Sequence, residues 1–282
     1  MNKVLRTPAI TLLTFLLFFC GIYRHDVPRE GVLALARQSQ FDCVGRVTHS
    51  GEAMGGSCVL IGPRYAISAA HVFTVFTAGS GRAINSASGY TFSFGGRDYH
   101  ASRITAYPTW IAGPRAQEGD LVFIELTEAV EGVEPAVLNT QFDELNTRVV
   151  GVGYGVAGRA DIPDSVGPCT EKTAGENMID SADGYTLAGR ATVLRCDFDH
   201  PSKASLNKMG SATPLPMEYA SGGGDSGGGL FSNAHGRWEL VGICSEGSNI
   251  LEELFVTGYY GGVMGWTRVA SFVDWIKAQR KE

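Results

Sequence analysis

The most informative stretch of this sequence is Ser221-Gly-Gly-Gly-Asp-Ser-Gly-Gly-Gly229, in which six glycines surround one Asp-Ser pair. Glycine adopts positive φ angles at no steric cost, so this segment can turn sharply and bring two backbone N–H groups to a common point. Two N–H groups aimed at one point form an oxyanion hole, which stabilises negative charge as it develops. The stretch therefore predicts a nucleophilic hydroxyl at Ser226.

A serine hydroxyl reacts near neutral pH only when a neighbouring base takes its proton. Of the six histidines, His71 is the best candidate, because it follows an apolar run at 65–70 that ends in small residues and leaves room for an imidazole. A histidine base in turn needs a carboxylate to fix its tautomer. Asp120 fits this role, because it opens the apolar run at 121–124, which would carry it into the interior.

Short apolar runs separated by turn residues recur along the chain, which is typical of an all-β fold. The runs of strand length lie at 44–47, 58–61, 65–67, 121–126, 149–152, 191–194, 230–231 and 239–244. The segment 128–146 has few strand signals and is the candidate linker between two halves. Val269, Val273 and Ile276 share one helical face, which predicts a closing helix over 270–280.

The composition narrows the class of protein further. The chain has 282 residues, 44% of them apolar and 18% charged, which is typical of a globular fold. Its net charge of −6 and the lack of a dense Lys/Arg block argue against nucleic acid or an anionic membrane as the partner. A substrate is the kind of partner that this composition favours.

The first residues have the features of an export signal. Lys3 and Arg6 precede an apolar stretch at 9–23, which is too short to span a bilayer comfortably. We therefore expect residues 1–21 to be a signal peptide and the protein to be secreted or periplasmic. Because Phe18 and Phe19 stand where a cleavage site needs small residues, a retained N-terminal membrane anchor is the alternative.

The cysteines allow two disulfides without requiring them. Removal of Cys20 with the signal would leave Cys43, Cys58, Cys169, Cys196 and Cys244. Cys43 and Cys58 are equidistant from a polar turn at 50–51, so a hairpin centred there would place them face to face. Cys169 with Cys196 is the other candidate pair. Reduced, buried thiols are the alternative for both pairs, and Cys244 is expected to be a buried thiol.

Three blocks occur in this order: Ser57-Cys-Val-Leu-Ile-Gly-Pro-Arg-Tyr-Ala-Ile-Ser-Ala-Ala-His71, Gly119-Asp-Leu-Val-Phe-Ile-Glu-Leu126 and Gly224-Asp-Ser-Gly-Gly228. They resemble the signature blocks of the chymotrypsin-like (trypsin-like) serine peptidases. The likeness continues through 238–247 and 265–275, so it covers nearly everything after Phe41. The resemblance implies two six-stranded antiparallel β-barrels with a C-terminal α-helix, divided here as 22–135, 136–268 and 269–282.

The resemblance also implies roles for individual residues. The triad would be His71, Asp120 and Ser226, with the N–H groups of Gly224 and Ser226 as the oxyanion hole. An edge strand at Ser245, Glu246 and Gly247 would pair with the backbone of an extended protein or peptide substrate. In this family the Asp before the nucleophile pairs with a new N-terminal amine made by proteolysis. Asp225 and Ile22 would be that pair if cleavage falls after Gly21.

Several positions depart from the family pattern. Val72 and Gly222 replace two usual cysteines, so two common bridges are missing. Ala220 stands where trypsin-like enzymes have a selecting Asp, which favours an uncharged side chain at P1, the substrate residue before the cut. Glu246 replaces an aromatic residue in the substrate-binding strand. It would favour basic groups further along the substrate or else point to solvent.

The sequence therefore predicts a serine endopeptidase that uses neither a metal nor a cofactor. A catalytically silent peptidase homologue that binds partners through the same cleft is the alternative, although such proteins usually lose one triad residue. An α/β-hydrolase is a weaker rival, because that fold needs an acid and a histidine after the serine. Here only His235 follows Ser226.

Overall fold

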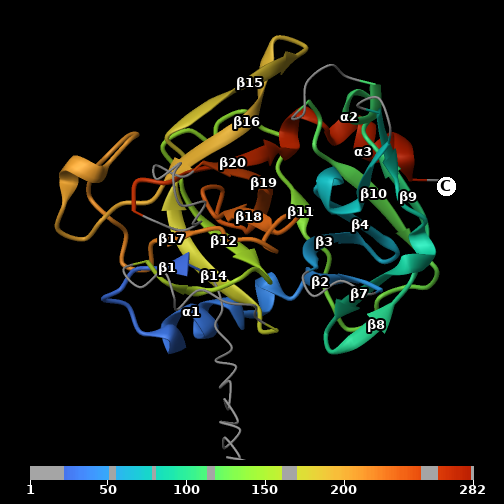
Figure 1. Ribbon diagram of the computed structural model, residues 1–282, viewed down its shortest axis with the longest axis horizontal. Helices are drawn as coiled ribbons and strands as arrows, with labels where there is room; N and C mark the ends of the chain where they lie inside the picture. Colours follow the sequence, from blue (N-terminus) through green and yellow to red (C-terminus); the bar gives the residue numbers. More distant parts are fainter. Residues whose placement is uncertain are drawn as a thin grey trace, which may run out of the picture.

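The computed structural model describes residues 22–50, 55–77, 81–112, 118–160, 170–248 and 260–280. Two antiparallel sheets dominate it, one from each half of the chain, and a helix closes the C-terminus (Figure 1). This confirms the expected all-β class with its C-terminal helix. The described strands number seven in the first sheet and eight in the second, against the six expected for each barrel.

The first sheet has the strand order β8-β7-β2-β3-β4-β10-β9. Its strands are β2 (Val44–His49), β3 (Gly56–Gly62), β4 (Tyr65–Ser68), β7 (Tyr90–Phe94), β8 (Arg97–Tyr99), β9 (Ala101–Ala106) and β10 (Val122–Leu126). Tyr90, Phe92 and Phe94 alternate with less buried residues along β7, as a strand with one face in the core requires. The hairpin β5 (Thr74–Thr77) with β6 (Gly81–Ile84), the helix α2 (Pro108–Ala112) and the 3-10 turns Ser39–Phe41, Ala70–Phe73 and Ala87–Gly89 complete this half.

The second sheet has the order β14-β12-β18-β19-β20-β16-β15, and β11 pairs with β19 off this path. Its strands are β11 (Val137–Leu138), β12 (Arg148–Gly153), β14 (Thr173–Met178), β15 (Ser181–Leu187), β16 (Arg190–Asp197), β18 (Gly229–Ser232), β19 (Glu239–Ser248) and β20 (Val263–Arg268). A 3-10 turn at Ala204–Leu206 lies between β16 and the glycine-rich segment. Each run of strand length that the sequence predicts lies within or overlaps one of the strands of the two sheets.

The segment that opens the described chain lies on the C-terminal half. Its strand β1 (Ile22–Tyr23) pairs with β13 (Gly158–Arg159) and β17 (Tyr219–Ala220). The helix α1 (Arg29–Ala36), which no sequence signal predicted, follows and packs near β14. The expected division at 135/136 stays a prediction, but residues 22–36 associate with strands from beyond it.

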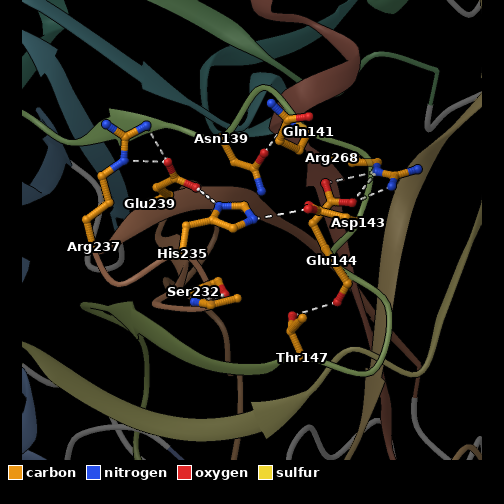
Figure 2. Close-up of polar contacts among 11 residues, drawn as sticks. Asn139, Gln141, Asp143, Glu144, Thr147, Ser232, His235, Arg237, Glu239 and Arg268 are labelled. Carbon is orange, nitrogen blue, oxygen red and sulfur yellow. Dashed lines mark hydrogen bonds and ion pairs between the residues drawn. The ribbon is translucent and has the colours of Figure 1, made fainter.

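The predicted linker at 128–146 is held on the second half by a polar cluster (Figure 2). The imidazole of His235 lies between Glu239, 2.7 Å from Nδ1, and Asp143, 3.0 Å from Nε2. Because carboxylates only accept hydrogen bonds, both ring nitrogens donate, and the bonds to Glu239 and Asp143 raise the pKa of His235. Beside it, Arg268 forms a buried ion pair with Glu144. These contacts fix both linker carboxylates to strands of the second sheet or their connections.

The closing helix is shorter than predicted. The structure has α3 at Val273–Gln279, preceded by a 3-10 turn at Val269–Ser271. The Ser271 hydroxyl donates a hydrogen bond to the carbonyl of Ala191, 3.1 Å away, which ties this turn to β16. Tertiary anchoring therefore delays the start of the α-helix by three residues relative to the predicted start at 270.

The proposed Cys43–Cys58 bridge is absent, which corrects the expectation from hairpin symmetry. Gly45, two residues beyond Cys43, lies opposite Cys58, so the two cysteines are out of register. Both thiols are buried, and burial raises the pKa of Cys43 to about 12. Cys196 is also an unbridged buried thiol, and Cys169 lies outside the described residues. Cys244 is buried and unbridged, as expected.

Residues 1–21, with the predicted signal, lie outside the described part of the chain. Within the described ranges, no helix combines the length and apolar character that crossing a membrane requires.

Three buried or partly buried carboxyl groups interact electrostatically: Asp180 before β15, Asp199 after β16 and Glu218 before β17. Burial raises the pKa of Glu218 to about 8 and those of Asp180 and Asp199 to about 6. Glu218 accepts hydrogen bonds from the backbone N–H groups of Asp199 and Leu215, which favour its ionised form but do not outweigh burial. Ionising this cluster therefore costs more in the folded chain than in the unfolded chain.

We expect the free energy of unfolding to fall as the pH rises from about 4, near the unfolded pKa values, towards 8, because these carboxyls ionise more easily in the unfolded chain. Glu218→Gln should flatten this slope between pH 6 and 8.5, as measured by urea titration. Glu131→Gln, at a side chain that is 81% exposed, is the matched control and should leave the slope unchanged. An unaltered slope in the Glu218 variant would contradict the assignment.

Candidate active site

The three residues singled out by the sequence converge in one hydrogen-bonded row. His71 Nε2 lies 2.7 Å from Ser226 Oγ, and His71 Nδ1 lies 2.7 Å from Asp120 Oδ2. The other oxygen of Asp120 accepts a hydrogen bond from the backbone N–H of His71 at 2.9 Å. Because a carboxylate only accepts, Nδ1 carries a proton, and in the neutral ring Nε2 is left to accept the proton of Ser226.

Strand pairing explains why His71 and Asp120 meet. His71 lies in the 3-10 turn that follows β4, and Asp120 lies two residues before β10. Val122 of β10 pairs with Ser68 of β4, so the end of one strand faces the start of the other. Asp120 is 3% exposed, whereas the His71 side chain is 34% exposed and open to a substrate.

The environment of His71 favours its protonated form. Burial alone lowers the pKa of His71, but the hydrogen bond and the negative charge of Asp120 outweigh it, so the pKa is raised above the ordinary value of 6.5. A base with a raised pKa accepts a proton more readily, which suits the transfer from the Ser226 hydroxyl.

The glycine-rich stretch forms a tight turn around Ser226. Gly224 has a φ of +94°, and the Asp225 N–H donates to the carbonyl of Gly222 at 3.0 Å. Within the described ranges, no hydrogen bond uses the N–H groups of Gly224 and Ser226. A substrate carbonyl oxygen can therefore be their acceptor.

Ser57 ties this turn to both halves of the molecule, a role that the sequence did not reveal. Its hydroxyl donates to the carbonyl of Gly224 at 3.0 Å and accepts from the N–H of Tyr154 at 2.9 Å. Its backbone N–H donates to the carbonyl of Ser226 at 2.8 Å. Ser57 stands at the start of the first signature block, but its side chain has no motif signal of its own.

Ser245 has a second role besides the expected one in substrate binding. Its hydroxyl donates to Asp120 Oδ2 at 2.6 Å, next to the bond from His71. The register of β19 against β20 shifts between Cys244 and Glu246, and such a bulge re-aims the extra side chain. Sequence spacing cannot show this bulge, so the contact was missed.

The segment from Ser245 to Gly247, whose role in substrate binding stays a prediction, is the end of strand β19. Pairing of β18 with β19 stops at Ile243, so the segment from Ser245 to Gly247 continues beyond its neighbour. Glu246 forms an ion pair with Arg195, with 2.5 Å between Oε1 and Nη1, and its side chain is mostly buried. A pocket of about 210 Å³ next to Ser226 is lined by Val47, His49, Gly55, His71, Val72, Tyr90 and Ser226.

Ala220 is 3% exposed and lies in β17, within the apolar core of the second half. The next residue, Ser221, donates its N–H towards the sulfur of Met264 at 3.2 Å. These neighbours are apolar or backbone groups. No charge is therefore seen at this position in the described structure, in agreement with the departure from the trypsin pattern.

The rival α/β-hydrolase arrangement is not formed. His235 is hydrogen-bonded to Glu239 and Asp143 in the polar cluster that holds the linker (Figure 2), whereas the hydroxyl of Ser226 is hydrogen-bonded to His71. The sheets are also antiparallel rather than the mostly parallel sheet of that fold.

Comparison with known proteins agrees with this geometry. Residues 34–276 match the sequence model of the family described as Trypsin, so the chain belongs to the trypsin family of chymotrypsin-like serine peptidases. A solved structure of neuropsin, described as a serine protease expressed in the limbic system of mouse brain, is similar in fold. It superposes with a TM-score of 0.58 at 17% identity, covering 91% of this chain and 97% of the other. No curated protein sequence matches the chain.

Proposed function

We propose that this protein is an active serine endopeptidase that hydrolyses peptide bonds through an acyl-enzyme. The observation that carries the proposal is the unbroken row from Asp120 through His71 to Ser226, with both outer distances at 2.7 Å. Membership of the trypsin family supports a peptidase in general. The row of hydrogen bonds supports catalysis over a silent binding role, because each group already has the partner that its chemical role needs.

In the proposed reaction, Ser226 Oγ attacks the scissile carbonyl carbon while His71 Nε2 takes its proton. The carbonyl oxygen becomes an oxyanion held by the N–H groups of Gly224 and Ser226. The C–N bond then breaks, and His71 returns the proton to the leaving amine. Water repeats the sequence on the acyl-enzyme, which releases the acid product and restores Ser226.

Covalent labelling tests this proposal directly. An organophosphonate probe should add to Ser226 alone, as located by peptide mass mapping, because only an activated serine displaces its leaving group rapidly. Ser232, a buried serine in β18, should stay unlabelled. A folded sample in which Ser226 resists the probe would favour the silent homologue, which keeps the cleft but not the chemistry.

We further propose that the enzyme cleaves after uncharged residues. Support comes from Ala220, which offers no carboxylate to pair with Arg or Lys, and from the thioether of Met264 beside Ser221. Cleavage of a peptide library, read by mass spectrometry, should show uncharged residues at P1. A strong preference for Arg or Lys would contradict this. Export from the cytoplasm stays a prediction that N-terminal sequencing of the natural protein would check.

A further inference from the structure

The carboxylate of Asp225, the residue before the candidate nucleophile, is held entirely by hydrogen bonds in the described structure. Asp225 is 1% exposed. Its Oδ2 accepts from the Tyr219 hydroxyl at 2.6 Å and from the Gly222 N–H at 2.8 Å. Its Oδ1 accepts from the Gly155 N–H at 2.8 Å. A buried carboxylate requires such donors, because it has lost its hydration.

This carboxylate helps to fix the geometry of the oxyanion turn, the segment from Gly222 to Gly228 that carries the two candidate oxyanion N–H groups. Asp225 stands between Gly224 and Ser226, the two residues whose N–H groups are to bind the oxyanion. Its backbone N–H donates to the Gly222 carbonyl at 3.0 Å, and its own carbonyl accepts from Gly228 at 2.7 Å. Fixing the side chain therefore fixes the backbone on both sides of it, which oxyanion binding needs to be preorganised.

Three glycines leave the space that the side chains of Tyr219 and Asp225 occupy. A Cβ at Gly153 would lie 2.4 Å from Asp225 Oδ1, and one at Gly155 would lie 2.4 Å from Asp225 Cγ. A Cβ at Gly175 would lie 2.0 Å from the Cβ of Tyr219. Glycines on β12, on the segment after it and on β14 thus let Tyr219 and Asp225 approach closely.

The expected alternative partner, an amine at Ile22, is near but is not bonded to Asp225. Ile22 is fully buried in β1 and pairs with Ala220, the neighbour of Tyr219. Among the described residues, Asp225 has its three donors while Ile22 supplies none of them. The carboxylate of Asp225 is therefore held by Tyr219 and two backbone N–H groups, with no contribution from Ile22.

We propose that the phenol of Tyr219 takes the role that a freed amine at Ile22 would have, so that the oxyanion hole forms without cleavage of the chain. This inference rests on the proposed function. Tyr219 is a positioning residue, because it acts through Asp225 and does not touch the substrate. Burial, with the charge of Asp225, raises the pKa of Tyr219 well above its usual value, so its hydroxyl stays protonated and remains a donor.

The first test compares one preparation before and after cleavage. Residues 17–21 of the full chain are replaced by Asp-Asp-Asp-Asp-Lys, so that enteropeptidase frees the amine of Ile22, and intact mass reports the N-terminus. The rate of organophosphonate labelling at Ser226 should change by less than about threefold on cleavage, because the turn is already formed. A rise of about 100-fold or more would overturn the inference and restore the Ile22 amine as activator. No labelling in either form would instead refute the proposed peptidase activity.

The second test removes one hydroxyl. Tyr219→Phe should lower kcat by about 10- to 100-fold with KM nearly unchanged, because the turn that binds the oxyanion is loosened while substrate contacts remain. Tyr99→Phe, at a buried tyrosine in strand β8 of the first sheet, is the matched control and should leave kcat unchanged. A purely structural role would lower the melting temperature without this split between kcat and KM. A folded Tyr219→Phe protein with normal kcat would overturn the inference. If the Tyr219→Phe variant does not fold, the comparison of labelling before and after cleavage still tests the inference.

Discussion

Replacing Ser226 with alanine should lower kcat by about 10⁶-fold, the loss expected when the nucleophile of a coupled triad is removed. The Ser226 hydroxyl is the only atom lost, and its partner in the structure is His71 Nε2 at 2.7 Å. Without it, no acyl-enzyme forms, and the remaining rate comes from water attack assisted by the oxyanion hole, about 10³- to 10⁴-fold above the uncatalysed reaction.

The measurement is steady-state hydrolysis of a peptide substrate at fixed pH, with substrate binding followed separately. KM should change little, because Ser226 contributes chemistry more than affinity. Ser232→Ala removes the same atom from a buried serine whose hydroxyl accepts a hydrogen bond from the Ala234 N–H, and it should keep nearly full kcat. If the Ser226→Ala protein kept more than about one part in a hundred of the rate, another group would have to be the nucleophile.

The site could be predicted from the sequence where its residues belong to contiguous blocks. His71, Asp120 and Ser226 each adjoin a strand or a glycine turn that the sequence displays, and the structure brings all three together. Ser245 and Tyr219 were given no such roles. Their contacts depend on a bulge in β19 and on close approach at Gly153, Gly155 and Gly175, which arise only when distant strands pack.

The fold could be predicted to a similar extent, and the predictions that were wrong failed for similar reasons. Short apolar runs and turn residues located the strands. Hairpin symmetry, however, predicted a register in which Cys43 faces Cys58, whereas Gly45 lies opposite Cys58. Register depends on which residues form the turn and on how many it contains, and apolar spacing alone does not specify that. The helix α1 was missed because it carries only a short apolar face, with Val32, Leu33 and Ala36 buried.

Asp120→Asn should lower kcat by about 10⁴-fold at neutral pH while the fold persists, because the amide has nearly the same shape as the carboxylate. Asp120 Oδ2 accepts from His71 Nδ1 at 2.7 Å and from the Ser245 hydroxyl at 2.6 Å. An amide nitrogen at this position would donate instead of accept. His71 would then hold its proton on Nε2, where it could no longer take the proton of Ser226.

Turning the amide round does not rescue the variant, because its nitrogen would then face the backbone N–H of His71, which now donates to Oδ1 at 2.9 Å. The flipped amide would therefore place one donor against another. The phosphonate labelling rate at Ser226 should fall with kcat, whereas KM should change little, since Asp120 is buried behind His71. Asp143→Asn makes the same substitution at a carboxylate bonded to His235 and should leave kcat unchanged. A tenfold loss or less in the Asp120 variant would mean that the orientation of His71 does not depend on this carboxylate.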